Sequence, residues 1–169
     1  GNMLWDFNIN DDSQFTDILI SDIQSPAVIH ENSLFVSNSA DKLISLNLLD
    51  GEKNWDLNIS TINPIVLAGN FLFVLTSENI IYSIDKLTGN VIWGTQLKKF
   101  DEDEKVTWVG PLLTSYKLIL ASSKGTILSL SPYSGNRISQ IDEKEGFLIQ
   151  PIQANKNISI KVMPGTIHG

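Results

Sequence analysis

Cysteine is absent from this sequence of 169 residues, and histidine is scarce. Without a thiol the chain has no cysteine nucleophile, no cysteine-bound zinc and no iron–sulfur cluster. Of the two histidines, we expect His30 to be an ordinary turn residue and His168 to serve packing. The glycine-rich, metal-binding and nucleophile-elbow motifs of common enzyme classes are also missing. These absences argue against catalysis.

Positive charge and long apolar runs are in short supply as well. Twelve Lys and Arg residues stand against 19 Asp and Glu, for a formal net charge of -7. A nucleic-acid partner requires a basic surface, so none is expected. No run of about 18 apolar residues predicts a transmembrane segment, and no basic-then-apolar leader is seen. With 42% hydrophobic and 18% charged residues, the composition is that of a globular domain.

What the chain does have is an internal repeat. A glycine followed four residues later by tryptophan occurs three times, and a fourth glycine has Ser139 in the tryptophan position. The repeat marks are Gly1 with Trp5, Gly51 with Trp55, Gly89 with Trp93, and Gly135. A spacing of about 40 residues is typical of repeat architectures such as propellers.

Each repeat reads as four short strands. In the clearest copy they are predicted at Ile65–Leu67, Phe71–Thr76, Ile80–Asp85 and Val91–Leu97. Runs of β-branched and aromatic residues between Gly, Asn and Ser turns predict hairpins. A proline opens every copy, where a strand tolerates it, at Pro26, Pro64, Pro111 and Pro151. Four strands per repeat indicate propeller blades.

Small residues alternate with large ones in equivalent strands. Ser45, Ser83 and Ser129 each lie between two large apolar or aromatic residues. Strict alternation places the serines on one face, where their size suggests close approach of a neighbouring sheet. Gly89 is expected to supply a positive φ in its turn. Trp93 is expected to fill the gap between successive sheets, with its indole N–H bonded to a backbone carbonyl of the turn.

The stretch SIDKLTGNVIW resembles the repeat signature of the pyrroloquinoline-quinone (PQQ) β-propeller superfamily. Asp85, Thr88, Gly89 and Trp93 match that signature, and Ser83 replaces the usual alanine. The other copies keep fewer of these residues. The structural repeat motif comprises Trp5, Gly51, Trp55, Asp85, Thr88, Gly89, Trp93 and Gly135.

Within that superfamily, the segments 106–139 and 147–162 look like late blades of the propeller lipoproteins of the bacterial outer-membrane β-barrel assembly machinery. The resemblance implies an all-β fold in which residues 1–169 form a single partial propeller of four-stranded PQQ-like blades. About four blades are expected, half of an eight-bladed ring. It also implies a non-catalytic scaffold on the periplasmic face of the outer membrane, with the β-barrel insertase as partner and any lipid anchor outside this chain.

Two alternatives remain, a fragment of a PQQ-dependent dehydrogenase and a ligand-sensing propeller domain. Such dehydrogenases hold Ca²⁺ and quinone, often beside a vicinal disulfide, and half a propeller cannot enclose a central cofactor. The acidic run Asp101–Lys105 lacks the glycine and the spacing of a calcium loop. We therefore expect no catalytic, cofactor-binding or metal residues and no cofactor.

The long loops are the remaining candidates for function. The segment Gln96–Pro111 is longer than the corresponding linker after Trp55, and the segment Asp6–Pro26 is longer still. Long loops on a rigid scaffold are common binding sites, so a partner-binding loop is predicted at Phe100, Asp101, Asp103 and Trp108. The alternative is that Trp108 and Phe15 cap the blade cores. An open half-propeller is also expected to self-associate through its uncovered blade faces.

Overall fold

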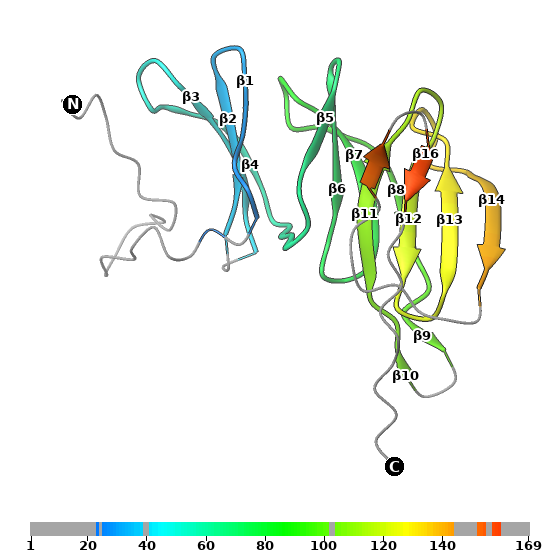
Figure 1. Cartoon of the computed structure of the whole chain (residues 1–169). Coiled ribbons are helices and arrows are strands. Elements are labelled where there is room, and N and C mark those ends of the chain that lie inside the picture. Colours follow the sequence, from blue (N-terminus) through cyan, green and yellow to red (C-terminus); the bar gives the residue numbers. More distant parts are fainter. Residues whose placement is uncertain are drawn as a thin grey trace.

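The computed structural model describes residues 23, 25–38, 41–101, 104–143, 152–154 and 157–159, and this part of the chain contains strands and no helix (Figure 1). Twelve of the strands form three four-stranded sheets. The first sheet contains β1 (Val28–His30), β2 (Ser33–Ser37), β3 (Leu43–Asn47) and β4 (Lys53–Leu57). The second contains β5 (Val66–Ala68), β6 (Phe71–Leu75), β7 (Ile80–Asp85) and β8 (Val91–Gln96). The third contains β11 (Trp108–Leu113), β12 (Leu118–Ser122), β13 (Thr126–Leu130) and β14 (Arg137–Asp142).

Each sheet is an antiparallel meander in which strands pair in chain order. The three sheets follow one another in space as they do in sequence (Figure 1). The predicted all-β fold of four-stranded propeller blades is confirmed, and the strands predicted for the clearest copy agree with β5 to β8 within one residue. Two short hairpins complete the described strands: β9 (Phe100–Asp101) with β10 (Glu104–Lys105), and β15 (Ile152–Ala154) with β16 (Asn157–Ser159). Residues 1–22, which include the repeat mark Gly1 with Trp5, lie outside the described residues.

The hydrophobic core lies between the sheets, because alternate residues of a strand face opposite sides. Leu72 and Val74 of β6 pack with Phe35, Leu43 and Trp55 of the first sheet. The intervening positions of β6, Phe73 and Leu75, join a second cluster with Leu118, Leu120, Leu128 and Leu130 of the third sheet. The middle sheet is therefore buried on both faces, as a propeller blade requires.

In the first and second sheets the repeated serine lies beneath two aromatic rings. Ser45 pairs with Phe35 on one side and Trp55 on the other, and the two ring centroids are 5.9 Å apart. Since strands two apart in a sheet are separated by about 9.5 Å, the rings must lean toward each other over the serine. Ser83 lies in the same way between Phe73 and Trp93, whose centroids are 6.1 Å apart. A larger residue would collide with the rings.

The two serines differ in hydrogen bonding, which gives a matched test. Ser45 Oγ accepts a bond of 3.2 Å from Asn54 Nδ2, whereas the buried Ser83 Oγ has no hydrogen-bond partner among the described residues. Because an unsatisfied buried hydroxyl is costly, Ser83→Ala is expected to raise the free energy of unfolding by about 1 kcal/mol. Ser45→Ala should lower it or leave it unchanged. Urea denaturation measures both, and a loss of stability in Ser83→Ala would contradict the assignment.

Trp55 and Trp93 each donate a hydrogen bond to a turn of the next sheet. Trp55 Nε1 donates to the carbonyl of Lys86 at 3.0 Å, and Trp93 Nε1 donates to that of Pro132 at 3.1 Å. The expectation of a turn carbonyl is confirmed, but that turn belongs to the following blade and not to the tryptophan's own. Gly89 has a φ of 74°, and a Cβ there would lie 2.8 Å from Cδ2 of Trp55. The glycine therefore receives the ring of the preceding blade.

The aspartate and threonine of the motif build that receiving turn. Asp85 Oδ1 accepts hydrogen bonds from the backbone N–H groups of Thr88 and Leu87 and from Thr88 Oγ1, at 2.9 to 3.0 Å. These bonds, led by the one from the Thr88 backbone, lower the pKa of the Asp85 carboxyl. The charged carboxylate thus holds Gly89 in the position where the ring of Trp55 packs.

Candidate functional site

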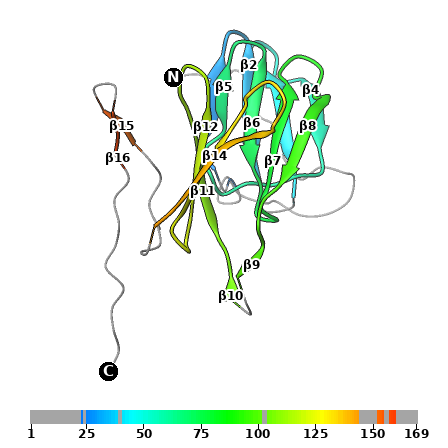
Figure 2. The same cartoon turned by 90° about the vertical axis from the view of Figure 1, so that its right-hand side faces the viewer.

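The connection between the second and third sheets carries a projecting hairpin. Its strands β9 and β10 pair Asp101 with Glu104 and Phe100 with Lys105. Figure 2 shows this hairpin extending beyond the end of β11, away from the three sheets. The connection after the first sheet forms no such hairpin. The described part of the predicted long loop therefore projects from one rim of the sheets.

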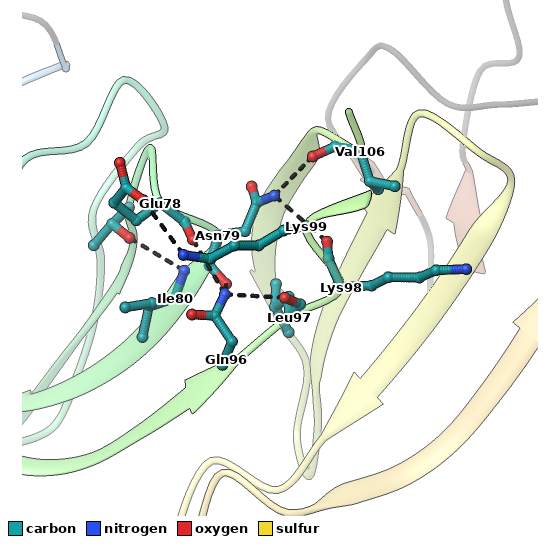
Figure 3. Close-up of polar contacts among 9 residues, drawn as sticks. Glu78, Asn79, Ile80, Gln96, Leu97, Lys98, Lys99 and Val106 are labelled. Atoms are coloured by element: carbon teal, nitrogen blue, oxygen red, sulfur yellow. Dashed lines mark hydrogen bonds and ion pairs between the residues drawn. The ribbon is translucent and has the colours of Figure 1, made fainter. Parts of the chain in front are cut away.

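The base of the hairpin is held by Asn79, in the turn between β6 and β7 (Figure 3). Asn79 Nδ2 donates to the carbonyl of Val106 at 2.7 Å and to that of Lys98 at 3.5 Å. The carbonyl of Asn79 accepts the N–H of Leu97 at 2.8 Å. One residue thus contacts both ends of the excursion. Its φ of 59° is in the left-handed region, which asparagine tolerates better than most residues.

Neighbouring side chains tie the same turn to the departing strand (Figure 3). Gln96 Nε2 donates to the carbonyls of Glu78, Asn79 and Leu97 at 3.0 to 3.1 Å. Lys99 Nζ lies 3.5 Å from Glu78 Oε2, an exposed ion pair of small energetic value. The hairpin therefore leaves the sheet from a base fixed mainly by amide–carbonyl hydrogen bonds.

Trp108 is placed in the core beneath the hairpin. It is 6% exposed and belongs to the cluster that contains Leu97 and Val106. Its Nε1 donates to the carbonyl of Lys98 at 2.9 Å. This burial supports the interpretation that Trp108 caps the core, in place of the predicted direct contact with a partner. The side chain stabilises the base of the hairpin and offers little surface.

Two of the other three predicted loop residues lie in the hairpin itself. Phe100 and Asp101 form β9, and Asp103 lies outside the described residues. Exposed charges of both signs accompany them at Lys99, Glu104 and Lys105. Glu104 forms an ion pair with Lys124 in the turn between β12 and β13.

The sequence predictions also concerned His30, His168, Trp5 and Phe15, of which the structure describes His30. His30 ends β1 beside a turn, and its Nδ1 lies 3.5 Å from Glu31 Oε2. Trp5, Phe15 and His168 lie outside the described residues. Asn79 is a site residue that the sequence pattern did not single out. The sequence shows an asparagine between two predicted strands, which indicates a turn. It does not show that the side chain of this asparagine bonds a segment far along the chain.

Replacing Asn79 tests whether the hairpin base depends on its amide. Asn79→Ala is expected to lower the free energy of unfolding by about 2 kcal/mol, because the buried carbonyl of Val106 loses its donor. Hydrogen exchange of the Val106 amide, which donates to Lys99 O at 2.8 Å, should accelerate. Asn79→Gly keeps the left-handed backbone accessible and isolates the loss of the amide. Unchanged exchange in both variants would show that the clamp is unimportant.

No three His, Cys, Asp or Glu side chains in the described ranges group in a way that could hold a metal ion. Within this same part of the chain, no helix is long and apolar enough to cross a membrane.

The meandering sheets, interlocked by a tryptophan from one and a glycine turn from the next, define a β-propeller of the PQQ type. A family model described as outer membrane protein assembly factor BamB matches residues 1–95. The chain belongs to this BamB-like family of PQQ-type propellers. No curated protein sequence matches the chain significantly.

Solved structures agree on the fold. BamB from Moraxella catarrhalis superposes with a TM-score of 0.66 at 16% identity, over 83% of this chain and 44% of that one. The computationally designed Ika4 protein gives 0.69 at 11% identity, over 98% and 95%. Quinohemoprotein alcohol dehydrogenase from Comamonas testosteroni gives 0.58 at 14% identity, over 70% and 21%. The chain thus spans less than half the length of the BamB structure.

Proposed function

We propose that this chain is part of a non-catalytic scaffold that binds proteins during outer-membrane β-barrel assembly, on the periplasmic face of the outer membrane. Membership of the BamB-like family supports a role in outer-membrane β-barrel assembly. The observation that carries the proposal is the projecting β9–β10 hairpin, whose base is fixed by Asn79 and Trp108. A fixed base lowers the conformational entropy that a partner must remove on binding.

The proposed contact surface is this hairpin, and the residues at stake are Phe100, Asp101 and Asp103. An aromatic side chain among charges suits a protein partner, because aromatic anchors within a polar rim dominate many interfaces. Trp108 acts indirectly, by holding the base. The proposed partner is the β-barrel insertase of the assembly machinery.

Pull-down of the insertase tests this proposal. The triple variant Phe100→Ala, Asp101→Ala and Asp103→Ala is expected to reduce the captured amount by about tenfold or more, as hot-spot residues do. The matched control replaces Ile92 of β8, which is 51% exposed, and the two exposed acidic residues Asp50 and Glu52 of the turn between β3 and β4. Equal capture by both variants would exclude the hairpin as the contact. No capture of any assembly subunit by the full-length protein would refute the role itself.

A quinoprotein fragment is the second candidate, favoured by the superposition on the alcohol dehydrogenase. Titration with PQQ and Ca²⁺ separates it from the scaffold. Stoichiometric quinone binding, or dye-linked alcohol oxidation, would replace the scaffold proposal, whereas a lack of binding agrees with it. A ligand-sensing propeller domain remains the third alternative.

Self-association is a further part of the proposal. In an open array of blades, each terminal sheet has a neighbour on one face only, and apolar faces of this kind favour association. Ile138 and Ile141 of β14 are half exposed. We expect the mass measured by light scattering to rise above 18.7 kDa with concentration, as two halves close a ring. A constant monomer mass over a wide concentration range would contradict this.

A further inference from the structure

The two boundaries between the three sheets are filled differently at one rim. At the first boundary, Lys86 of the β7–β8 turn reaches back to the first sheet and is 8% exposed. Its Nζ lies 3.5 Å from Glu31 Oε2 and 3.3 Å from His30 Nδ1. A long aliphatic chain, a carboxylate and an imidazole therefore occupy this position between the sheets.

Strand register identifies the same positions at the second boundary. Val28 pairs with Phe35 as Val66 pairs with Phe73, so Ala68 and Gly69 correspond to His30 and Glu31. The turn bond from Gly89 N to Asp85 O recurs from Gly135 N to Ser131 O, so Pro132 corresponds to Lys86. All three large side chains are thus replaced by alanine, glycine and proline.

The smaller residues leave a cavity of about 410 Å³ that is open at the rim. Its wall includes Gly69, Phe71, Phe73, Leu113, Pro132 and Tyr133. The lining contains no charged side chain, and its polar groups are the amide of Asn70 and the hydroxyls of Thr114, Ser115 and Tyr133. Burying a charge here would be costly, whereas the volume suits a neutral aromatic group.

The surface beside the cavity is also apolar. Tyr133 at its mouth is 79% exposed, and Tyr116 of the neighbouring β11–β12 turn is 77% exposed. The positions equivalent to Tyr133 in the other sheets, Leu87 and Leu49, are 65% and 72% exposed. An apolar residue thus stands at the same turn position in all three sheets. Such a row fits an extended polypeptide better than a small free molecule, because apolar surface continues past the cavity.

We propose that this cavity receives an aromatic side chain of an extended segment of a partner protein. The site is separate from the hairpin. In an antiparallel meander, the turns that border the cavity lie on one rim, and the β6–β7 turn with the hairpin lies on the other. The two sites can therefore be tested independently.

The first test uses ¹⁵N NMR of the full chain with an uncharged pentapeptide, acetyl-Ser-Gly-Trp-Gly-Ser-amide. The peptide is expected to shift the amides of Gly69, Thr114 and Tyr133, and its alanine counterpart should not. If free indole binds as tightly as the peptide, the proposal that a polypeptide occupies the cavity is wrong. A tryptophan peptide that leaves these three amides unshifted refutes the site.

The second test closes the cavity with the residues of the first boundary. The variant Gly69→Glu with Pro132→Lys should weaken peptide binding by about tenfold or more. The backbone tolerates glutamate there, because Glu31 has a φ of 53° and Gly69 has 58°. Unchanged affinity in this folded variant would refute the proposal.

The reciprocal variant, Glu31→Gly with Lys86→Ala, should open a second cavity. New shifts are then expected near Ile29 and Leu87 in addition to the original ones. If the folded variant shows no new shifts, the smaller side chains at the second boundary do not explain the cavity. Both variants leave the hairpin intact, so insertase pull-down serves as the control for the proposed function.

Discussion

Alanine at Gly89 is expected to lower the free energy of unfolding by about 3 kcal/mol. Its φ of 74° alone costs a non-glycine residue roughly 1–2 kcal/mol. The added Cβ would also lie 2.8 Å from Cδ2 of Trp55. That ring is held between Phe35 and the carbonyl of Lys86, so it cannot move away freely, and overpacking adds about 1–3 kcal/mol.

Gly69→Ala provides the matched control. Gly69 has a similar φ of 58°, but no atom lies within 4 Å of an added Cβ. This variant should therefore lose only the backbone contribution, about 1 kcal/mol. Chemical denaturation of both variants isolates the steric contribution of the Trp55 ring. Equal losses would mean that the ring does not pack against Gly89 as described.

Trp108→Ala is expected to lower the free energy of unfolding by about 3–5 kcal/mol, the usual loss for truncating a buried tryptophan. The ring packs in the cluster between the second and third sheets, and its N–H bonds Lys98. Loss of partner capture in this variant would therefore reflect a damaged hairpin base. The same denaturation experiment measures the effect.

Trp108→Phe separates packing from the hydrogen bond. It retains an aromatic ring but leaves the Lys98 carbonyl without the indole donor, for an expected loss of about 1 kcal/mol. If Trp108→Ala were as stable as the parent protein, the indole would be dispensable for the core. A contact role for Trp108 would then regain support.

The fold is largely determined by local sequence pattern. Alternation along Ile80–Asp85 and the turns at Gly69 and Gly89 place the strands of the second sheet within one residue of their observed bounds. These features depend on side-chain period and on backbone freedom, which act over a few residues. Repetition of the pattern then indicates blades, because each sheet must bury both faces against its neighbours.

The pairing of residues between blades depends on tertiary structure. Gly89 and Trp93 are neighbours in the sequence signature, yet Gly89 receives Trp55 and Trp93 bonds the turn of the third sheet. Tertiary packing also determines three other features. They are the burial of Trp108, the contacts of Asn79 with both ends of the hairpin, and the cavity beside Pro132. By itself the sequence determined the strands, the repeat and the all-β class. Only the packing of one sheet on the next decided which side chains meet, because those contacts join separate elements of the chain, as with Trp55 and Lys86, which are 31 positions apart.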